Sequence, residues 1–402
     1  MPDLSTDLIH HPYQPPAGFA APQPGVFKAS TVIFADVAAM RAADRNTKSG
    51  YSYGLHGTPT SYLLEERLCT LEGGLQCLLA PSGLSAISTV ALALLRSGDE
   101  VLIPDNSYGP NKTLAETLLT GWGIRHRTYD ALRPQDLADK ISAQTRLVWL
   151  EAAGSVTLEF PDLPELVRIC RRHAVCSALD NTWGAGQAFQ AFDLAPGEGQ
   201  PLGVDLTVHA LTKYPSGGGD VLMGSIITRD PALHRRIRQA RMHLGLGVAA
   251  NDIETILRGL PSLGLRYRAH DSATRVLARW AQGRSEFAQV LHPSLPDSPG
   301  YAHWRALCRQ DSGGAAGLFS VIFPERYAPA QVDAFCNALR LFRLGYSWGG
   351  PMSLVVPYKL AEMRQGWPDH LQPGTLVRFS IGLEAVADLQ ADLEQALLRA
   401  LA

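Results

Sequence analysis

A lysine that directly follows an apolar run is the strongest chemical signal in this sequence. Lys213 comes after the run at 206–210 and before the glycines at 217–219. Burial at the end of a strand disfavours the ammonium form, so the amine becomes available as a nucleophile that can form a Schiff base. Thr212 offers a hydroxyl to a phosphate, and the glycines let backbone approach a ligand closely. Taken alone, the pattern also fits a solvated lysine.

An aspartate ends a second apolar run. Asp180 follows residues 176–179, which we interpret as a buried strand. The carboxyl ends of parallel strands form the ligand-binding edge of such a sheet. A carboxylate there suits a protonated pyridine nitrogen, which turns a pyridine cofactor into an electron sink. The alternative is that Asp180 caps the turn that follows it.

A third segment has the pattern of a strand, a tight glycine turn and a helix start. It comprises residues 80–85, with Gly83 and Leu84 at the expected first turn of the helix. Free backbone N–H groups and the helix dipole at such a point can hold a phosphate. The segment is not a Walker loop, and an ordinary strand–helix turn is the alternative.

Two more residues have types that suit ligand recognition. Tyr108 follows the predicted strand at 101–103, where an aromatic ring can stack on a planar cofactor. Arg378 lies in a predicted strand among apolar neighbours, and arginine is rarely buried without a partner. The carboxylate of an amino-acid substrate would satisfy it through paired hydrogen bonds. A surface tyrosine and an internal ion pair are the alternatives.

The elements that must position these residues alternate between strand and helix. This order predicts an α/β fold with a mainly parallel sheet between helices. Helices are predicted at 62–72, 83–95 and 114–119, and strands at 76–80, 101–103, 147–150, 175–179 and 206–210. Two long helices, 251–260 and 263–282, lead to a smaller α+β domain with strands at 317–322 and 377–381 and a helix at 387–401. The expected domains are a proline-rich N-terminal arm at 1–58, a cofactor-binding domain at 59–255 and a C-terminal domain at 256–402.

Composition excludes several classes of function. The 402 residues are 46% hydrophobic and 18% charged, with a net charge of −2, so no nucleic-acid partner is expected. The densest arginine cluster, at 235–241, is interpreted as a solvated helix face. No apolar run reaches the roughly eighteen residues of a membrane span, and the N-terminus lacks the features of a secretory signal. The six cysteines have no metal-ligand spacing, which favours reduced core residues in a cytoplasmic protein without a metal site.

Taken together, these segments resemble the Cys/Met-metabolism family of pyridoxal-phosphate enzymes of fold type I. The similarity extends from about Leu8 to Leu398. Matching strings occur at Leu71–Gly74, Asp180–Trp183, Thr212–Tyr214, Arg258–Leu260, Tyr346–Gly350 and Thr375–Glu384. The strings at Asp180–Trp183 and Tyr346–Gly350 are more similar to the β-lyase branch than to the γ branches.

The resemblance implies a role for each matching residue. Lys213 would carry pyridoxal 5'-phosphate as a Schiff base and move protons, with Tyr108 as a second proton donor. The expected cofactor-binding residues are Lys213, Asp180, Tyr108, Gly83, Leu84, Thr212, Thr182 and Tyr53. The expected substrate-binding residues are Arg378, Ser347, Trp348, Ser155 and again Tyr53. Tyr53 would act in the neighbouring subunit of a homo-oligomer, which is expected to be a tetramer of two tight dimers.

The implied activity is carbon–sulfur β-elimination. Cystathionine, or a related S-conjugate of cysteine, would give a thiol (homocysteine), pyruvate and ammonia. The first alternative is a γ-replacement or γ-elimination enzyme, namely a cystathionine γ-synthase, a methionine γ-lyase or an O-acylhomoserine sulfhydrylase. A distant one is a serine hydrolase, because Gly345, Ser347 and Gly349 match the GxSxG pattern and Asp369 and His370 follow. The last alternative is a protein that keeps this fold as a scaffold and has no catalytic activity.

Two positions depart from the family pattern. The family usually has an arginine two residues after Tyr53, where this chain has Leu55. Either His56 replaces part of that phosphate contact or the cofactor binds more weakly. The family also commonly has a proline near the position of Ala153. These changes bear on substrate identity more than on cofactor use.

Overall fold

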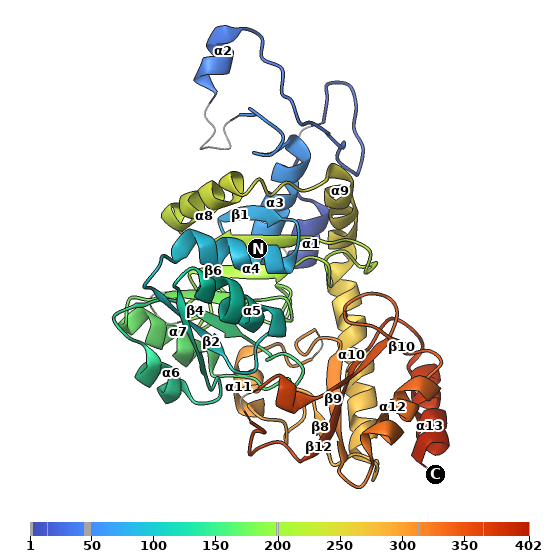
Figure 1. Cartoon of the computed structure of the whole chain (residues 1–402). Coiled ribbons are helices and arrows are strands. Elements are labelled where there is room, and N and C mark those ends of the chain that lie inside the picture. Colours follow the sequence, from blue (N-terminus) through green and yellow to red (C-terminus); the bar gives the residue numbers. More distant parts are fainter. Residues whose placement is uncertain are drawn as a thin grey trace.

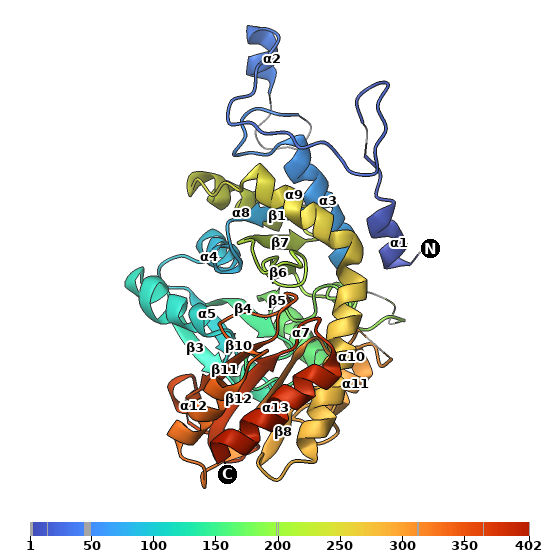
Figure 2. The ribbon, with the colours of Figure 1, turned by 90° about the vertical axis from the view of Figure 1, so that its right-hand side faces the viewer.

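Two β-sheets with flanking helices make up the body of the protein (Figures 1 and 2). The computed structural model describes residues 3–13, 15–43, 50–197, 199, 201–311, 313–364 and 366–401. The strands of the larger sheet are, in spatial order, β1 (Gln76–Ala80), β7 (Gly224–Thr228), β6 (Leu206–Ala210), β5 (Cys176–Asp180), β4 (Thr145–Glu151), β2 (Glu100–Pro104) and β3 (Arg125–Tyr129).

The larger sheet is mainly parallel, as the sequence predicts. Strands β6, β5, β4, β2 and β3 run parallel to one another, whereas β7 is antiparallel to both of its neighbours. No strand was predicted at the position of β7. Because β7 returns beside β6, the loop at 211–223 lies at the carboxyl end of β6, and this loop carries Lys213. The antiparallel strand therefore helps to fix the position of the lysine.

Helices on both faces of this sheet begin and end at recognisable signals. They are α3 (Pro59–Glu72), α4 (Gly83–Leu94), α5 (Gly109–Leu114), α6 (Pro134–Lys140), α7 (Leu163–Arg172), α8 (Pro231–His243) and α9 (Ala250–Gly259). Helix α3 starts at a capping box in which Thr58 and Ser61 exchange hydrogen bonds, with Pro59 as first residue. It ends at Gly73, whose φ of 77° is left-handed. The predicted helix at 62–72 began three residues late because proline was not used as a start signal.

The smaller sheet belongs to the C-terminal part of the chain. Its strands are, in spatial order, β10 (Arg343–Leu344), β11 (Leu354–Tyr358), β12 (Gly374–Ser380), β9 (Leu318–Pro324) and β8 (Gln289–Leu291). Its helices are α11 (Tyr301–Leu307), α12 (Pro329–Ala338) and α13 (Val386–Leu401). The long helix α10 (Leu263–Gln282) runs from the larger sheet to the smaller one (Figure 1). The exact boundary between residues 255 and 256 stays a prediction.

Buried aromatic residues join the two parts of the protein next to the lysine. Tyr214, which follows Lys213, is fully buried and packs edge-on against Tyr267 of α10. Its hydroxyl accepts a hydrogen bond of 2.7 Å from the backbone N–H of Gly317, which precedes β9. The lysine loop is therefore held between the two sheets.

The N-terminal segment extends away from this body as an arm (Figures 1 and 2). Helix α1 (Leu4–Ile9) rests on α3 and buries Leu8, whereas α2 (Val37–Ala42) buries none of its residues. The arm exposes several large apolar side chains, among them Phe19, Ile33 and Met40. Exposed apolar surface of this kind is typical of segments that contact another subunit.

The prediction of a solvated arginine face on α8 was wrong for two of its four arginines. Arg238 and Arg241 are only 5% and 7% exposed. Arg241 donates hydrogen bonds to the backbone carbonyls of Leu79 and Leu55, at 2.6 and 2.8 Å. Helical periodicity turns half of the cluster inward, where backbone carbonyls of other segments satisfy the Arg241 guanidinium.

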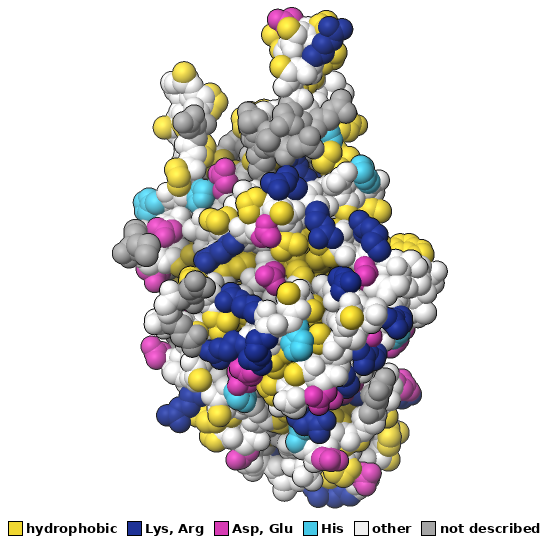
Figure 3. Space-filling model, turned by 90° about the vertical axis from the view of Figure 1, so that its left-hand side faces the viewer, with side chains coloured by type: hydrophobic (Ala, Val, Ile, Leu, Met, Phe, Trp, Pro, Cys, Tyr) yellow, Lys and Arg dark blue, Asp and Glu magenta, His cyan; other side chains and the backbone are white. Residues whose placement is uncertain are grey.

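Charges of both signs are interspersed on the surface shown in Figure 3. Basic and acidic side chains alternate there over the whole height of the body. In the part of the chain that the structure describes, no helix has the length and apolar character needed to cross a membrane.

Candidate active site

A cavity of about 620 Å³ opens between the carboxyl edge of the larger sheet and the smaller sheet. Its size falls in the usual range for small-molecule sites. All but one of the predicted site residues line it, namely Gly83, Leu84, Tyr108, Ser155, Asp180, Thr182, Thr212, Lys213, Ser347, Trp348 and Arg378. The cavity therefore brings together side chains from both parts of the protein.

The one predicted site residue outside this cavity is Tyr53. It lies on the arm, where its backbone pairs with Thr31 and its side chain is 47% exposed. Its expected role in a neighbouring subunit stays a prediction.

Lys213 lines the cavity and contacts two residues of the C-terminal part. Its Nζ donates a hydrogen bond of 2.7 Å to Oγ of Ser347 and lies 5.4 Å from the centre of the Trp348 ring. Burial lowers the pKa of the Lys213 ammonium from its ordinary value to about 8, and the positive charge of Arg378 contributes to this lowering. A much larger fraction of this amine is therefore neutral near neutral pH than for a surface lysine.

Two carboxylates stand side by side at the sheet edge of the cavity. Glu151 ends β4 and Asp180 ends β5, and the two residues are register partners in the parallel sheet. Burial raises the pKa of both carboxyl groups, and the proximity of Asp180 raises that of Glu151 further. Thr182 opposes this trend at Asp180, because its backbone N–H and its hydroxyl both donate to Oδ1 of the aspartate.

The amino end of α4 closes another side of the cavity. Ser82 caps this helix by accepting a hydrogen bond from the N–H of Ser85, while Gly83 and Leu84 form the first turn. A Cβ atom at Gly83 would lie 2.7 Å from Cβ of Ala210 at the end of β6, which is too close for any side chain. The glycine therefore brings the N–H groups of the helix start against the strand that leads to Thr212 and Lys213.

Tyr108 lines the cavity at the start of α5. Its backbone N–H donates a hydrogen bond of 2.8 Å to Oε2 of Glu151. Burial raises the pKa of the Tyr108 phenol, and the charges of Asp180 and Glu151 raise it further. The side chain remains 40% exposed, so its ring is accessible from the cavity.

Arg378 reaches the cavity from the smaller sheet. It lies in β12 and is 7% exposed, and its Nη2 donates a hydrogen bond of 3.4 Å to the carbonyl of Ser347. Its guanidinium carbon is 5.3 Å from the centre of the Tyr358 ring. Among the described residues, no group accepts a hydrogen bond from its Nε. The internal ion pair considered as an alternative is not found among them, so this arginine can still bind an acid.

Several residues of the cavity wall were not predicted as site residues. Glu151 has the same signal as Asp180, a carboxylate at the end of an apolar strand, and could have been found by it. Most of the other missed residues are apolar and include Leu222, Leu318, Tyr346, Tyr358 and Met363. Apolar residues of this kind have no sequence signal that separates a cavity wall from a core.

The hydrolase hypothesis does not fit this geometry. The hydrogen-bond partner of Ser347 is Lys213, whereas Nε2 of His370 lies 2.5 Å from Oε1 of Glu159. A serine hydrolase needs its histidine beside the nucleophile. The GxSxG match at 345–349 is therefore a coincidence of spacing.

Comparison with known proteins agrees with this arrangement. A family described as Cys/Met metabolism PLP-dependent enzyme matches residues 5–398. The chain belongs to this family.

Individual relatives extend over almost the whole chain. A cystathionine β-lyase of Bordetella avium is 37% identical over 405 residues, covering 98% of this chain and 97% of the relative. A cystathionine β-lyase of Salmonella typhimurium is 35% identical over 373 residues, covering 91% of each. Among solved structures, a cystathionine γ-synthase of Xanthomonas oryzae in complex with aminoacrylate and cysteine has a TM-score of 0.86. It is 28% identical and covers 100% of this chain and 99% of its own.

The family membership makes this a pyridoxal-phosphate-dependent enzyme of fold type I that acts on amino acids. The cavity fits that cofactor on three counts. A buried lysine with a lowered pKa can hold the aldehyde, and the start of α4 can hold the phosphate. A buried carboxylate to which the described residues form no ion pair can meet the pyridine nitrogen.

Proposed function

We propose that the enzyme cleaves the Cβ–S bond of cystathionine or a related S-conjugate of cysteine, giving, with one molecule of water, a thiol, pyruvate and ammonia. The observation that carries this proposal is the convergence of Lys213, Asp180 and Arg378 on one cavity. The two β-lyase relatives, each at least 35% identical over nine-tenths of the chain, support it.

Lys213 would hold the cofactor and move the proton. With the substrate bound, its neutral amine would remove the proton from Cα of the substrate. The lowered pKa suits both tasks, because a general base works best when its pKa is near the working pH. Ser347 receives a hydrogen bond from the amine and so directs Nζ toward the cavity.

Pyridoxal phosphate, when bound, supplies an electron sink for the electrons of the broken Cα–H bond. Asp180 would keep the ring nitrogen protonated, and Thr182 would hold the aspartate in place. Thr212, Gly83 and Leu84 would hold the phosphate, and the ring of Tyr108 would stack on the pyridine. These roles agree with the burial and the hydrogen bonds of Asp180 and with the packing of Gly83.

Arg378 would bind the substrate carboxylate, helped by Ser347 and flanked by Trp348. Its Nε has no acceptor among the residues that the structure describes, and its guanidinium is held against the Tyr358 ring. Ser155 would lie beside the cofactor, since it also lines the cavity. When the Cβ–S bond breaks, Lys213 or Tyr108 would protonate the leaving thiolate.

Product analysis tests the proposal. Cystathionine with the purified holoenzyme is expected to yield pyruvate and homocysteine, and Lys213→Ala is expected to abolish turnover. Formation of 2-oxobutyrate would instead support γ-elimination. This second candidate is favoured by the likeness to a cystathionine γ-synthase structure. A Lys213→Ala variant with full activity would contradict both.

The assembly that we propose is a homo-oligomer, with a tetramer as the expected size. The exposed apolar side chains of the arm support a contact between subunits. In such an assembly Tyr53 would reach the cavity of a neighbour. Leu55 cannot supply the phosphate contact that the family arginine makes, so we propose that His56 supplies part of it.

We further propose that the enzyme works in the cytoplasm. All six cysteines are free, and four of them are buried. Reduced, buried cysteines are typical of proteins in a reducing compartment.

A further inference from the structure

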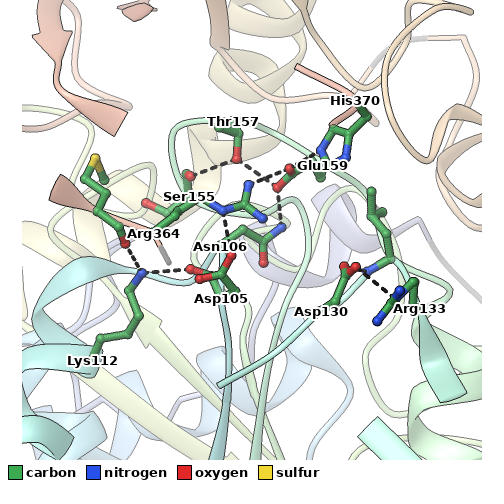
Figure 4. A network of polar contacts seen from close by, with 12 residues as sticks. Asp105, Asn106, Lys112, Asp130, Arg133, Ser155, Thr157, Glu159, Arg364 and His370 are labelled. Carbon is green, nitrogen blue, oxygen red and sulfur yellow. Dashed lines mark hydrogen bonds and ion pairs between the residues drawn. The ribbon is translucent and has the colours of Figure 1, made fainter. Parts of the chain in front are cut away.

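A polar network centred on the buried Glu159 joins two loops of the cofactor-binding part to the C-terminal part, next to the cavity (Figure 4). Its members are Asp105, Asn106, Thr157, Glu159, Arg364 and His370, which we name the junction network. Asp105 and Asn106 follow β2, and Thr157 and Glu159 lie between β4 and α7. Arg364 and His370 belong to the segment between β11 and β12. Its members therefore come from three separate parts of the chain.

Glu159 is the centre of this network. Its side chain is fully buried. Its Oε2 accepts hydrogen bonds from Nδ2 of Asn106 at 2.6 Å and from the hydroxyl of Thr157 at 2.8 Å. Its Oε1 meets Nη1 of Arg364 at 2.6 Å and Nε2 of His370 at 2.5 Å. Four partners around one carboxylate keep it ionised and leave it little freedom to move.

Arg364 connects the two parts of the protein. Its side chain is 7% exposed, and it bridges Oε1 of Glu159 and, at 2.8 Å through Nε, Oδ2 of Asp105. The residue before it, Met363, lines the cavity, and the carbonyl of Met363 accepts a hydrogen bond from Nζ of Lys112. Arg364 thus binds one carboxylate in each of two loops from a position beside the cavity wall.

Both of these loops carry predicted site residues. Tyr108 lies two residues beyond Asn106, and Ser155 lies two residues before Thr157. The loops also contact each other, because the N–H of Ser155 donates a hydrogen bond of 2.7 Å to the carbonyl of Asn106. A Cβ atom at Gly154 would lie 2.2 Å from Nδ2 of Asn106, so their packing leaves no room for a side chain there. A movement of Glu159 or Asp105 would therefore displace Tyr108 and Ser155.

We infer that Glu159 and Arg364 are positioning residues for the proposed lyase reaction. They hold the loop of Tyr108 against the loop of Ser155 and hold Met363 of the C-terminal part beside both. Neither of them lines the cavity, so they act through Asn106 and Asp105 and touch no ligand. The expected effect on kcat and KM rests on the proposed function. The expected effect on cofactor binding does not, because it depends only on the geometry of the loops.

The test uses Arg364→Ala, with Arg364→Lys as the conservative variant and Arg133→Ala as the matched control. Arg133 appears in the same view, where its side chain is 70% exposed and pairs with Asp130 at 3.3 Å. Four quantities are measured: the dissociation constant of pyridoxal phosphate from the apoprotein, kcat and KM for cystathionine, and deuterium uptake of the apoprotein at residues 152–159.

Arg364→Ala is expected to lower kcat by about 10²-fold, since displacement of catalytic groups by about 1 Å costs that much. It should also weaken cofactor binding and raise deuterium uptake at 152–159. Arg364→Lys should restore part of each loss, because an ammonium group reaches one of the two carboxylates. Arg133→Ala should stay within about twofold of the unaltered enzyme, as expected for an exposed ion pair.

An Arg364→Ala enzyme that melts at a lower temperature, but keeps the cofactor affinity, kcat and KM of the unaltered enzyme, would overturn the inference. If Arg364→Ala does not fold, Thr157→Val decides by the same criteria, because it removes one hydrogen bond to Glu159 without a change of charge. If the unaltered enzyme binds the cofactor but does not cleave cystathionine, the proposed reaction fails. Cofactor affinity and deuterium uptake then still decide the positioning role.

Discussion

The edge of the larger sheet and the junction network treat buried carboxylates in opposite ways. At the edge, Asp180 and Glu151 lie side by side, and no ion pair to either is found in the described part of the chain. In the network, Glu159 meets Arg364 and His370. Accordingly, burial raises the pKa of the first two carboxyl groups, whereas the pKa of Glu159 is lowered to about 2.

This difference distinguishes the carboxylates of the candidate active site from a carboxylate that holds other residues in place. A buried carboxylate without a cation is costly, and a protonated pyridine ring would remove that cost at Asp180. The carboxylate of Glu159 already has its counter-charges, so it gains nothing from a ligand and can serve only to hold other groups. Substitutions at the two places should therefore change different properties of the enzyme.

Among substitutions of these buried carboxylates, the largest effect is expected at Asp180. Asp180→Asn keeps the size of the side chain but removes the charge that would hold the pyridine nitrogen protonated. Loss of one preorganised electrostatic partner typically costs about 10²- to 10³-fold in kcat, and we expect the upper end of this range. Steady-state kinetics measures it. A variant with kcat within tenfold of the unaltered enzyme would show that the nitrogen has another partner.

Glu159→Gln should destabilise the fold. Removing one partner of a buried ion pair leaves Arg364 undercompensated and costs about 3 kcal/mol in the free energy of unfolding. Because the pKa of Glu159 is lowered from 4.5 to about 2, the carboxylate stabilises the protein above pH 4.5, and this contribution is lost as the pH falls toward 2. Urea unfolding of both proteins between pH 7 and about pH 3 measures it, and a difference that does not narrow below about pH 4.5 would be inconsistent with this pairing.

The amine of Lys213 should titrate well below an ordinary lysine. In the apoprotein, its labelling by an amine-reactive reagent should rise by about tenfold per pH unit and level off near pH 8. Because the charge of Arg378 contributes to the lowering, Arg378→Leu should move the plateau to higher pH. Peptide mass spectrometry follows the label on this residue. A profile still rising steeply above about pH 9.5 would argue against a desolvated amine.

Glu151→Gln should have the smallest effect and the opposite sign to Glu159→Gln. Its pKa is raised, so ionisation of Glu151 opposes folding, and this cost grows as the pH rises above the ordinary carboxyl pKa. Glutamine still accepts the hydrogen bond from Tyr108. The free energy of unfolding at neutral pH should therefore stay equal or rise by about 1 kcal/mol. A loss of several kcal/mol in urea unfolding would mean that the carboxylate has a counter-charge.

The sequence predicted the fold and most of the cavity because the relevant residues interrupt apolar runs. Asp180 ends a buried strand, Arg378 lies within one and Lys213 closely follows one. A polar residue at such a place usually has a structural or functional role. A parallel sheet brings its strand ends to one edge, so the apolar runs favoured Lys213 and Asp180 as neighbours. Each pattern alone also fitted an ordinary structural role, and the resemblance to the family was needed to decide between them.

The junction network could not be predicted in the same way. Glu159 and Arg364 lie 205 residues apart in polar loops, where charged residues are ordinary. Strand β7 and the buried half of α8 escaped prediction for related reasons, since tertiary contacts decide both. The aromatic wall at Tyr346 and Tyr358 was missed because apolar residues at a cavity look like core.

The central claim is that Lys213 carries the cofactor opposite Asp180. Borohydride reduction of the holoenzyme fixes pyridoxal phosphate on the lysine that holds it, and peptide mass spectrometry locates the adduct. We expect a single adduct on Lys213. An adduct on Lys112 or any other lysine, with Lys213 unmodified, would contradict this assignment.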